Sequence, residues 1–143
     1  MSETVTPRTL GPHSPEYTVT VAHALAESVR VLNHATRSAD AIDYPATVYQ
    51  VLGALYTATG RLPQLLGQLS RWLEREAEAG RLAESRHGDV IAAVATGEDA
   101  LARASRQILA VTAGLEAAQQ AIAFVYRRDD DEAAGEAGGE GAG

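Results

Sequence analysis

The sequence contains no cysteine, and aromatic side chains make up only 5% of its 143 residues. The lack of cysteine excludes disulfides, cysteine-ligated zinc sites and thiol nucleophiles. The formal net charge of -7 argues against a nucleic-acid surface, because phosphate binding requires clustered cationic side chains. No uncharged run reaches the roughly 20 apolar residues that cross a bilayer. The first residues also lack the apolar core of a secretory signal. We therefore expect a cytoplasmic protein that neither spans a membrane nor binds nucleic acid.

Lysine is also absent, so all 12 basic residues are arginine, whereas alanine occurs 28 times and glycine 13 times. This bias is typical of coding sequence with a high GC content, such as that of actinomycete bacteria. Alanine has the highest helix propensity of all residues. The composition therefore favours an all-α fold.

The chain divides by composition into three parts. Residues 1–13 are polar and rich in proline and glycine, which predicts a flexible N-terminal arm. Residues 14–128 carry the helical patterns described below. Residues 129–143 hold six acidic residues, no basic residue and no large apolar residue, which predicts a disordered acidic tail. Since residues 16–128 contain twelve acidic residues and eleven arginines, the negative charge belongs mainly to the tail.

Apolar residues recur at helical spacing in three segments of the central part. The first segment starts at the capping residue Ser14 and extends over about 15–42. The second covers about 46–79 and ends at Gly80. Its apolar stripe keeps its phase through Gly60 and Pro63, which favours one long helix kinked near 60–63. The stripe consists of Val48, Leu52, Leu55, Thr59, Leu62, Leu66, Leu69 and Leu73. Two shorter helices joined by a turn are the alternative.

The third segment starts at Asp89, which is expected to cap a helix of about 89–127. Its large apolar residues recur every seven positions, at Val94, Leu101, Ile108, Leu115 and Ile122. A companion column, also seven apart, consists of Val90, Gly97, Ala104, Val111, Ala118 and Val125. Alternating large and small residues suit close antiparallel packing. We therefore predict an antiparallel bundle of three long helices, or of four if the kink is a turn.

The second segment has a wider apolar arc than packing on one side requires. Tyr49 and Tyr56 are seven apart, and so are Leu65 and Trp72. One interpretation is a central helix that touches two neighbours. The other is that these four residues form an interface with a partner or with a second copy, with Trp72 as an anchor.

Chemistry-bearing residues are few, and no cofactor or catalytic residue is predicted. One weak candidate for a metal site is a group on one face of the first predicted helix, which consists of His23, Glu27 and His34. Glu84 and His87 have a metal-ligand spacing, but they lie in a polar connector. The segment Gly60-Arg61-Leu62-Pro63 lacks the glycine-rich nest and the lysine of a phosphate loop.

One stretch of the second segment, between alanine-rich flanks, reads Leu62-Pro63-Gln64-Leu65-Leu66-Gly67-Gln68-Leu69-Ser70-Arg71-Trp72-Leu73. It resembles segments of small helical proteins of actinomycete bacteria. The resemblance covers about a quarter of the chain and implies no activity. From the residues we predict a non-enzymatic helical interaction or scaffold module that associates with itself. The alternatives are a small regulatory protein whose acidic tail binds a basic partner, and a metal-binding helical bundle.

Overall fold

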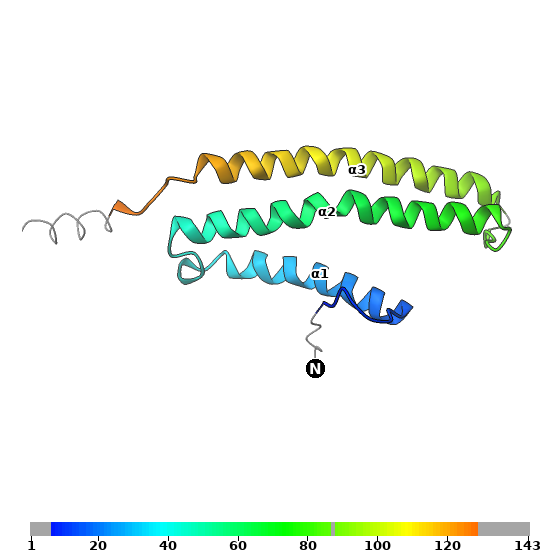
Figure 1. The fold of residues 1–143 in the computed structure, drawn as a ribbon, viewed down its shortest axis with the longest axis horizontal. Coiled ribbons are helices and arrows are strands. Elements are labelled where there is room, and N and C mark those ends of the chain that lie inside the picture. The colour runs from blue at the N-terminus through cyan, green and yellow to red at the C-terminus, as the bar shows by residue number, and fades with distance from the viewer. Residues whose placement is uncertain (1–6, 87, 129–143) are drawn as a thin grey trace, which may run out of the picture. The chain divides into compact units, whose positions relative to one another are not determined.

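The computed structural model describes residues 7–86 and 88–128, and all regular structure within them is helical. The all-α prediction is thereby confirmed. The chain divides into two units, Met1–Asp43 and Tyr44–Gly143 (Figure 1). The helices are, in chain order, α1 (Pro15–Ala35), the short 3-10 helix η1 (Ala39–Ala41), α2 (Pro45–Glu78) and α3 (Val90–Ala121). The predicted acidic tail, 129–143, lies outside the described residues.

Helix α1 of the first unit begins as predicted and ends earlier than predicted. The Ser14 hydroxyl accepts the N–H of Tyr17 at 3.1 Å and caps the helix. The helix ends at Ala35, seven residues before the expected end near 42. There the hydroxyl of Thr36 donates to the Leu32 carbonyl at 2.8 Å. The N–H groups of Arg37 and Ser38 then donate to the carbonyls of His34 and Ala35, three residues back, at 3.2 and 3.0 Å. The α-helical bonding pattern thus gives way to a tighter turn, and η1 follows separately.

Helices α2 and α3 of the second unit run antiparallel and side by side as a hairpin (Figure 1). Helix α2 continues through Pro63, so the segment is one helix and not two. Gly80 ends it with a φ of 67°, a conformation that favours glycine. The N–H of Gly80 donates to the Ala77 carbonyl at 2.9 Å, and the N–H of Arg81 donates to the Glu76 carbonyl at 3.0 Å. This pair of bonds is the Schellman arrangement expected at a glycine-terminated helix.

Helix α3 begins at the predicted cap, because Asp89 Oδ1 accepts the N–H groups of Ile91 and Ala92 at 2.9 and 3.2 Å. It ends at Ala121, six residues before the expected end near 127. The segment beyond is rich in β-branched and aromatic residues, which have lower helix propensity. Phe124 is 94% exposed and gains no packing that would offset this propensity. No helix within the described ranges is long and apolar enough to cross a bilayer.

Candidate interaction surface

The contact between α2 and α3 follows one line on each helix, here called the seam. The large column predicted for the last helix lies on it, because all five of its residues are half-buried. The seam residues of α2 that face this column are Leu52, Leu55, Leu62, Leu66 and Leu73, also half-buried. Ala77, at 8% exposure, is the one buried residue among those described. The hairpin therefore has a continuous apolar contact but almost no interior.

The companion columns do not stay on the seam. Val111 and Leu69 were expected there, yet they are 54% and 49% exposed. Their neighbours Thr112 and Ser70 are half-buried in their place. Positions seven apart drift by about 20° per heptad on a straight α-helix. After several heptads the next residue therefore faces the partner helix, and the apolar residue is turned outward.

Ala118 is exposed while Gln119 is half-buried, so the same one-residue slip occurs a heptad further along α3. Val125 of the same predicted column is 54% exposed and lies beyond the end of the helix. The prediction that Val111, Ala118 and Val125 pack in the bundle is therefore wrong for this hairpin.

One side of the seam, here called the glycine side, is built from Gly53 and Gly60 of α2 with Gln119 and Thr112 of α3. The Gln119 side chain lies over Gly53, and its Nε2 donates to the Tyr49 carbonyl at 3.2 Å. A Cβ at Gly53 would lie 2.5 Å from that Nε2, whereas a Cβ at Gly60 would lie 3.9 Å from the Thr112 methyl group. The missing side chain at position 53 thus makes room for a polar contact between the helices.

The register of these two pairs continues along the hairpin. Gly53 and Gly60 are seven apart, as are Gln119 and Thr112, so a further step of seven in this antiparallel pairing places Ser105 opposite Gly67. Charged side chains follow on the same side. Among them, Glu98 accepts a bond from the Ser70 hydroxyl at 3.5 Å. The glycine side is consequently polar and partly charged.

The other side of the seam, here called the Leu–Trp face, comprises Val51, Leu65, Leu69, Trp72, Ala100 and Val111. At 3.6 residues per turn, Leu65, Leu69 and Trp72 lie on the flank of α2 away from Gly53 and Gly60. Val111 precedes Thr112 by one residue and is therefore turned away from the glycines too. The exposed fractions of Leu65, Leu69, Trp72 and Val111 are 45, 49, 50 and 54%. Large apolar side chains from both helices thus share one face.

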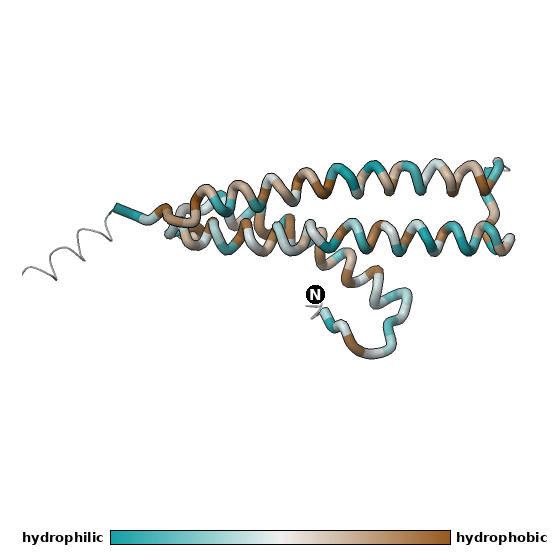
Figure 2. Tube along the Cα trace, turned by 45° about the horizontal axis from the view of Figure 1, so that its top comes forward, coloured by the Kyte–Doolittle hydropathy of each residue, from teal (hydrophilic) through white to brown (hydrophobic). Residues whose placement is uncertain are grey.

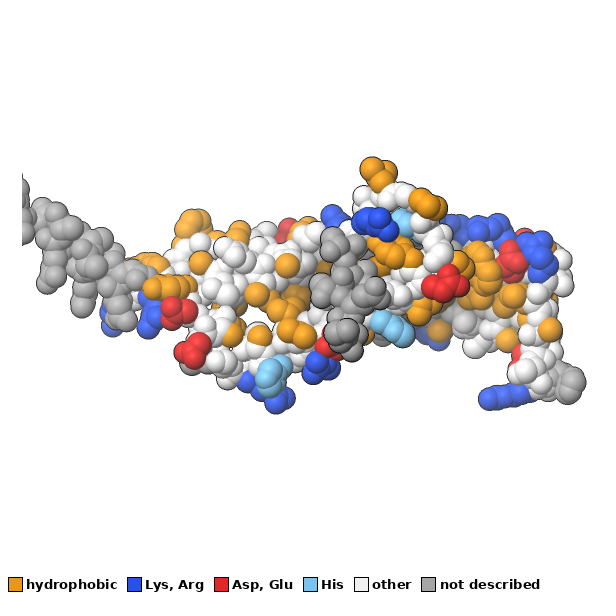
Figure 3. Space-filling model, turned by 90° about the horizontal axis from the view of Figure 1, so that it is seen from below, with side chains coloured by type: hydrophobic (Ala, Val, Ile, Leu, Met, Phe, Trp, Pro, Cys, Tyr) orange, Lys and Arg blue, Asp and Glu red, His pale blue; other side chains and the backbone are white. Residues whose placement is uncertain are grey.

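The Leu–Trp face carries few charges. Helical steps of three and four residues along α2 from Thr47 to Trp72 meet one charged residue, Arg61, between Ala58 and Leu65. The corresponding steps along α3 from Ala93 to Ala118 meet one as well, Arg103, between Ala100 and Gln107. Figure 2 shows apolar and polar stretches alternating along both helices. Figure 3 shows hydrophobic side chains reaching the surface between charged ones.

The structure separates the four predicted interface residues into two pairs. Tyr49 and Tyr56 each precede a glycine by four residues, one helical turn, and therefore lie on the glycine side. They are 40% and 36% exposed. Leu65 and Trp72 belong to the Leu–Trp face. Their role in an interface stays a prediction, but the four cannot form one continuous patch on a single hairpin.

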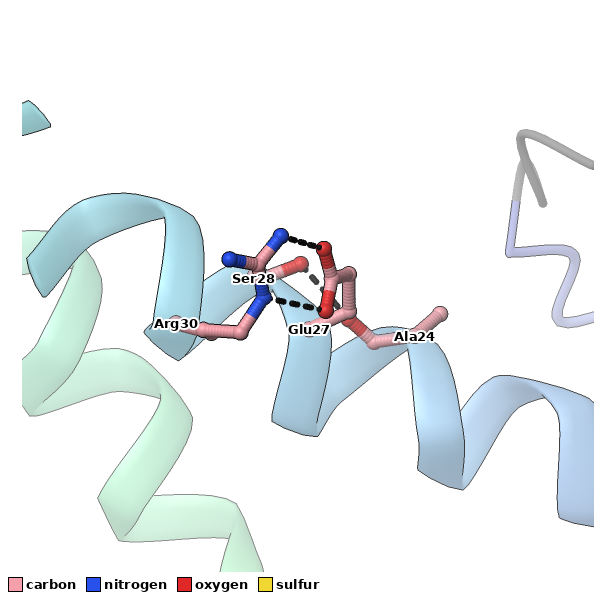
Figure 4. Close-up of polar contacts among 4 residues, drawn as sticks. All are labelled: Ala24, Glu27, Ser28 and Arg30. Atoms are coloured by element: carbon pink, nitrogen blue, oxygen red, sulfur yellow. Dashed lines mark hydrogen bonds and ion pairs between the residues drawn. The ribbon is translucent and has the colours of Figure 1, made fainter. Parts of the chain in front are cut away.

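The candidate metal residues on α1 are not gathered into a ligand set. His23 and His34 are eleven residues apart, about 16 Å along the axis at 1.5 Å per residue. The carboxylate of Glu27 accepts two bonds from Arg30, at 2.6 and 2.8 Å (Figure 4). These bonds hold the pKa of Glu27 below its ordinary value. Within the described residues, no three histidine, aspartate or glutamate side chains are placed to hold a metal ion.

The connector between α2 and α3 is organised by two carboxylates. Glu84 Oε2 accepts the N–H groups of Arg86 and Gly88 at 2.9 and 2.8 Å, so Glu84 stabilises the turn. Glu76 accepts two bonds from Arg81, at 2.6 and 2.7 Å, across the end of α2. The bonded Arg81 guanidinium lowers the pKa of the Glu76 carboxyl. His87, the other half of the predicted metal spacing, lies outside the described residues.

Sequence reasoning missed Leu69 and Val111 as surface residues. Val111 was assigned to a packed column by its seven-residue spacing, and Leu69 was assigned to the apolar stripe of the second segment. A helical wheel drawn at 3.6 residues per turn would have placed both side chains on the outer surface, next to Leu65 and Trp72. Comparisons of the chain with family models, curated proteins and solved structures return no match.

Proposed function

We propose that this protein is a non-enzymatic helical interaction module that works by associating with a second copy of itself. The observation that carries the proposal is the burial of the described residues. Only Ala77 is buried, while three large side chains of α2 in one row are about half exposed. The helical repeat of these side chains makes them one surface and not scattered apolar residues.

The energetics of a lone hairpin favour such an association. Ordering a backbone costs roughly 1–2 kcal/mol per residue. Buried apolar surface is the main term that offsets this cost, at about 25 cal/mol per Å². Helices α2 and α3 order 34 and 32 residues around a seam that is half-buried at best. A second chain that covers the exposed row would supply the missing burial.

Sedimentation equilibrium of the full chain over a wide concentration range tests the proposal. We expect a mass of twice the 15.0 kDa of one chain at high concentration, falling on dilution. Helix content measured by circular dichroism should fall with it, because folding and association are then coupled. A mass of 15.0 kDa at every concentration, with cooperative unfolding that does not depend on concentration, would contradict self-association.

A further inference from the structure

We propose that two copies dock through their Leu–Trp faces, with α2 of one copy lying antiparallel on α2 of the other. This inference rests on the proposed self-association and adds the face, the pairing and the symmetry axis. The two-fold axis stands perpendicular to the helices and passes through the middle of α2, near Leu62. The result is a four-helix arrangement of two hairpins.

The size and polarity of the face fit a stable dimer. At 1.5 Å per residue, α2 is about 51 Å long, and two helices side by side are about 20 Å wide, which gives roughly 1,000 Å² per copy. A standard stable interface buries about 800 Å² per partner. Arg61 is the one charged residue that helical steps meet on this flank between Thr47 and Trp72, and its long side chain can extend to water at the edge of the face. The glycine side carries Arg71, Glu74 and Glu98, three ions that would have to be desolvated.

The distribution of side-chain sizes along α2 points to a second copy as the occupant. The large residues Leu65, Leu69 and Trp72 lie in the C-terminal half of this flank. The N-terminal half of the same flank offers the smaller Val51, Ala54 and Ala58. An antiparallel copy places Leu65 against Ala58, Leu69 against Ala54 and Trp72 against Val51, and the same three contacts recur on the other side of the axis. The face is therefore complementary to itself, as a two-fold interface must be.

This pairing also keeps the spacing between the two hairpins even. Large residues meet small ones along the whole α2–α2 contact. Apart from Arg103 at its outer edge, the corresponding flank of α3 has residues no larger than Gln107 and Val111 among alanine, glycine and threonine, so the two α3 helices can approach closely. If α2 lay on α3 of the second copy instead, large side chains would fall only near the turn and the helices would diverge.

Two matched substitutions test which face is used. Leu69 and Leu109 are exposed to similar extents, 49% and 57%, but Leu109 lies beyond Thr112 on the glycine side. We expect Leu69→Glu to raise the dimer dissociation constant about 100-fold or more, because each copy would bury an unpaired carboxylate. Leu109→Glu should change it less than about threefold, as expected for a residue outside the buried core of the interface. Sedimentation equilibrium measures both.

The outcomes separate the face from the self-association. If the two substitutions raise the dimer dissociation constant equally, or if Leu109→Glu raises it more, the Leu–Trp face is not the docking face, although the dimer itself exists. A wild-type chain that is monomeric throughout overturns the dimer and the face together. A monomer whose free energy of unfolding falls with Leu69→Glu would show that the face is covered within one chain, which also overturns the inference.

Disulfide trapping tests the antiparallel pairing even if Leu69→Glu unfolds the chain. Because the protein has no cysteine, Ala54→Cys and Leu69→Cys each introduce a single thiol. Positions 54 and 69 are about 22 Å apart on one helix at 1.5 Å per residue, so neither variant alone should form a disulfide between copies. An oxidised mixture of the two variants should yield a covalent dimer. Rapid trapping of either variant alone, or none in a mixture that is dimeric, overturns the pairing.

Discussion

The two sides of the α2–α3 seam differ in what they can do for the molecule. On the glycine side, small backbone positions receive polar side chains of the partner helix, as when Gln119 bonds to the Tyr49 carbonyl over Gly53. On the Leu–Trp face, large apolar side chains extend beyond the hairpin, and no described residue of the second unit lies opposite them. The glycine side joins the two helices to each other, whereas the Leu–Trp face is suited to a further partner. The two sides differ because glycines flank the seam on one side and large apolar residues flank it on the other.

The largest effect expected of a truncation is that of Trp72→Ala on assembly. An aromatic anchor of an interface typically contributes 2 kcal/mol or more to binding, so we expect roughly a 30-fold or larger rise in the dimer dissociation constant. Tyr56→Ala, on the glycine side, is the matched control and should change it less than about threefold. Sedimentation equilibrium of the two variants compares the sides directly. If Trp72 were instead core of a single chain, Trp72→Ala would lower the free energy of unfolding by ~3–5 kcal/mol at every protein concentration.

A pair of glycine substitutions probes the other side of the comparison. Gly60→Ala adds a methyl group in ordinary contact with Thr112, 3.9 Å away, and should raise the free energy of unfolding by about 1 kcal/mol through helix propensity. Gly53→Ala gains the same propensity but displaces Gln119. The loss of that bond to the Tyr49 carbonyl costs about 1 kcal/mol, so the net change should be close to zero. Urea unfolding of both variants at one protein concentration measures the difference.

Equal stabilisation by the two substitutions would show that the bond from Gln119 contributes nothing to the hairpin. The double variant Gly53→Ala/Gln119→Ala is the control. With no side chain left to displace, the propensity gain at position 53 should reappear relative to Gln119→Ala alone.

The smallest expected effect is a pH dependence at the end of the Leu–Trp face. Glu76 lies four residues after Trp72, where that flank ends. Its pKa is lowered in the folded chain by the bonds from Arg81, relative to an ordinary value of 4.5. A lowered folded-state pKa stabilises the protein above the unfolded value, and this contribution is lost as the pH falls through the folded pKa.

Urea unfolding of the wild type and of Glu76→Gln between pH 3 and 7 should therefore give curves that are separated at neutral pH and converge on acidification. The lowered pKa values of Glu16 and Glu27 act on both proteins and cancel in the difference. A separation that stays constant down to pH 3 would mean that the ion pair does not contribute to folding.

The end of α2 and the start of α3 were predictable because each depends on local chemistry. Asp89 caps α3 through its own carboxylate, and Gly80 ends α2 because its φ of 67° suits glycine. The continuity of α2 through Pro63 was also predictable, since the apolar stripe keeps its phase across it. The early ends of α1 and α3 were not, because the pattern of apolar residues continues past the point where the backbone leaves the helix.

The candidate surface was predicted in part. Leu65 and Trp72 were recognised as apolar residues beyond the main stripe, and their half-exposed positions agree with that. Tyr49 and Tyr56 share their spacing but not their side of the helix, which becomes evident only once the seam is located. Leu69 was assigned to the apolar stripe of its segment and Val111 to a packed column, and a small drift per heptad places them on the surface.

The sequence by itself determined that the chain forms helices, where α2 and α3 begin, and which residues form the large column of the seam, since these depend on propensity, caps and period. Only the tertiary structure decided which flank of each helix faces outward. That choice depends on how far the two helices coil around each other, and a small residual angle per heptad adds up over 32 to 34 residues. The accumulated angle moves Ser70, Thr112 and Gln119 toward the seam and leaves Leu69 and Val111 exposed.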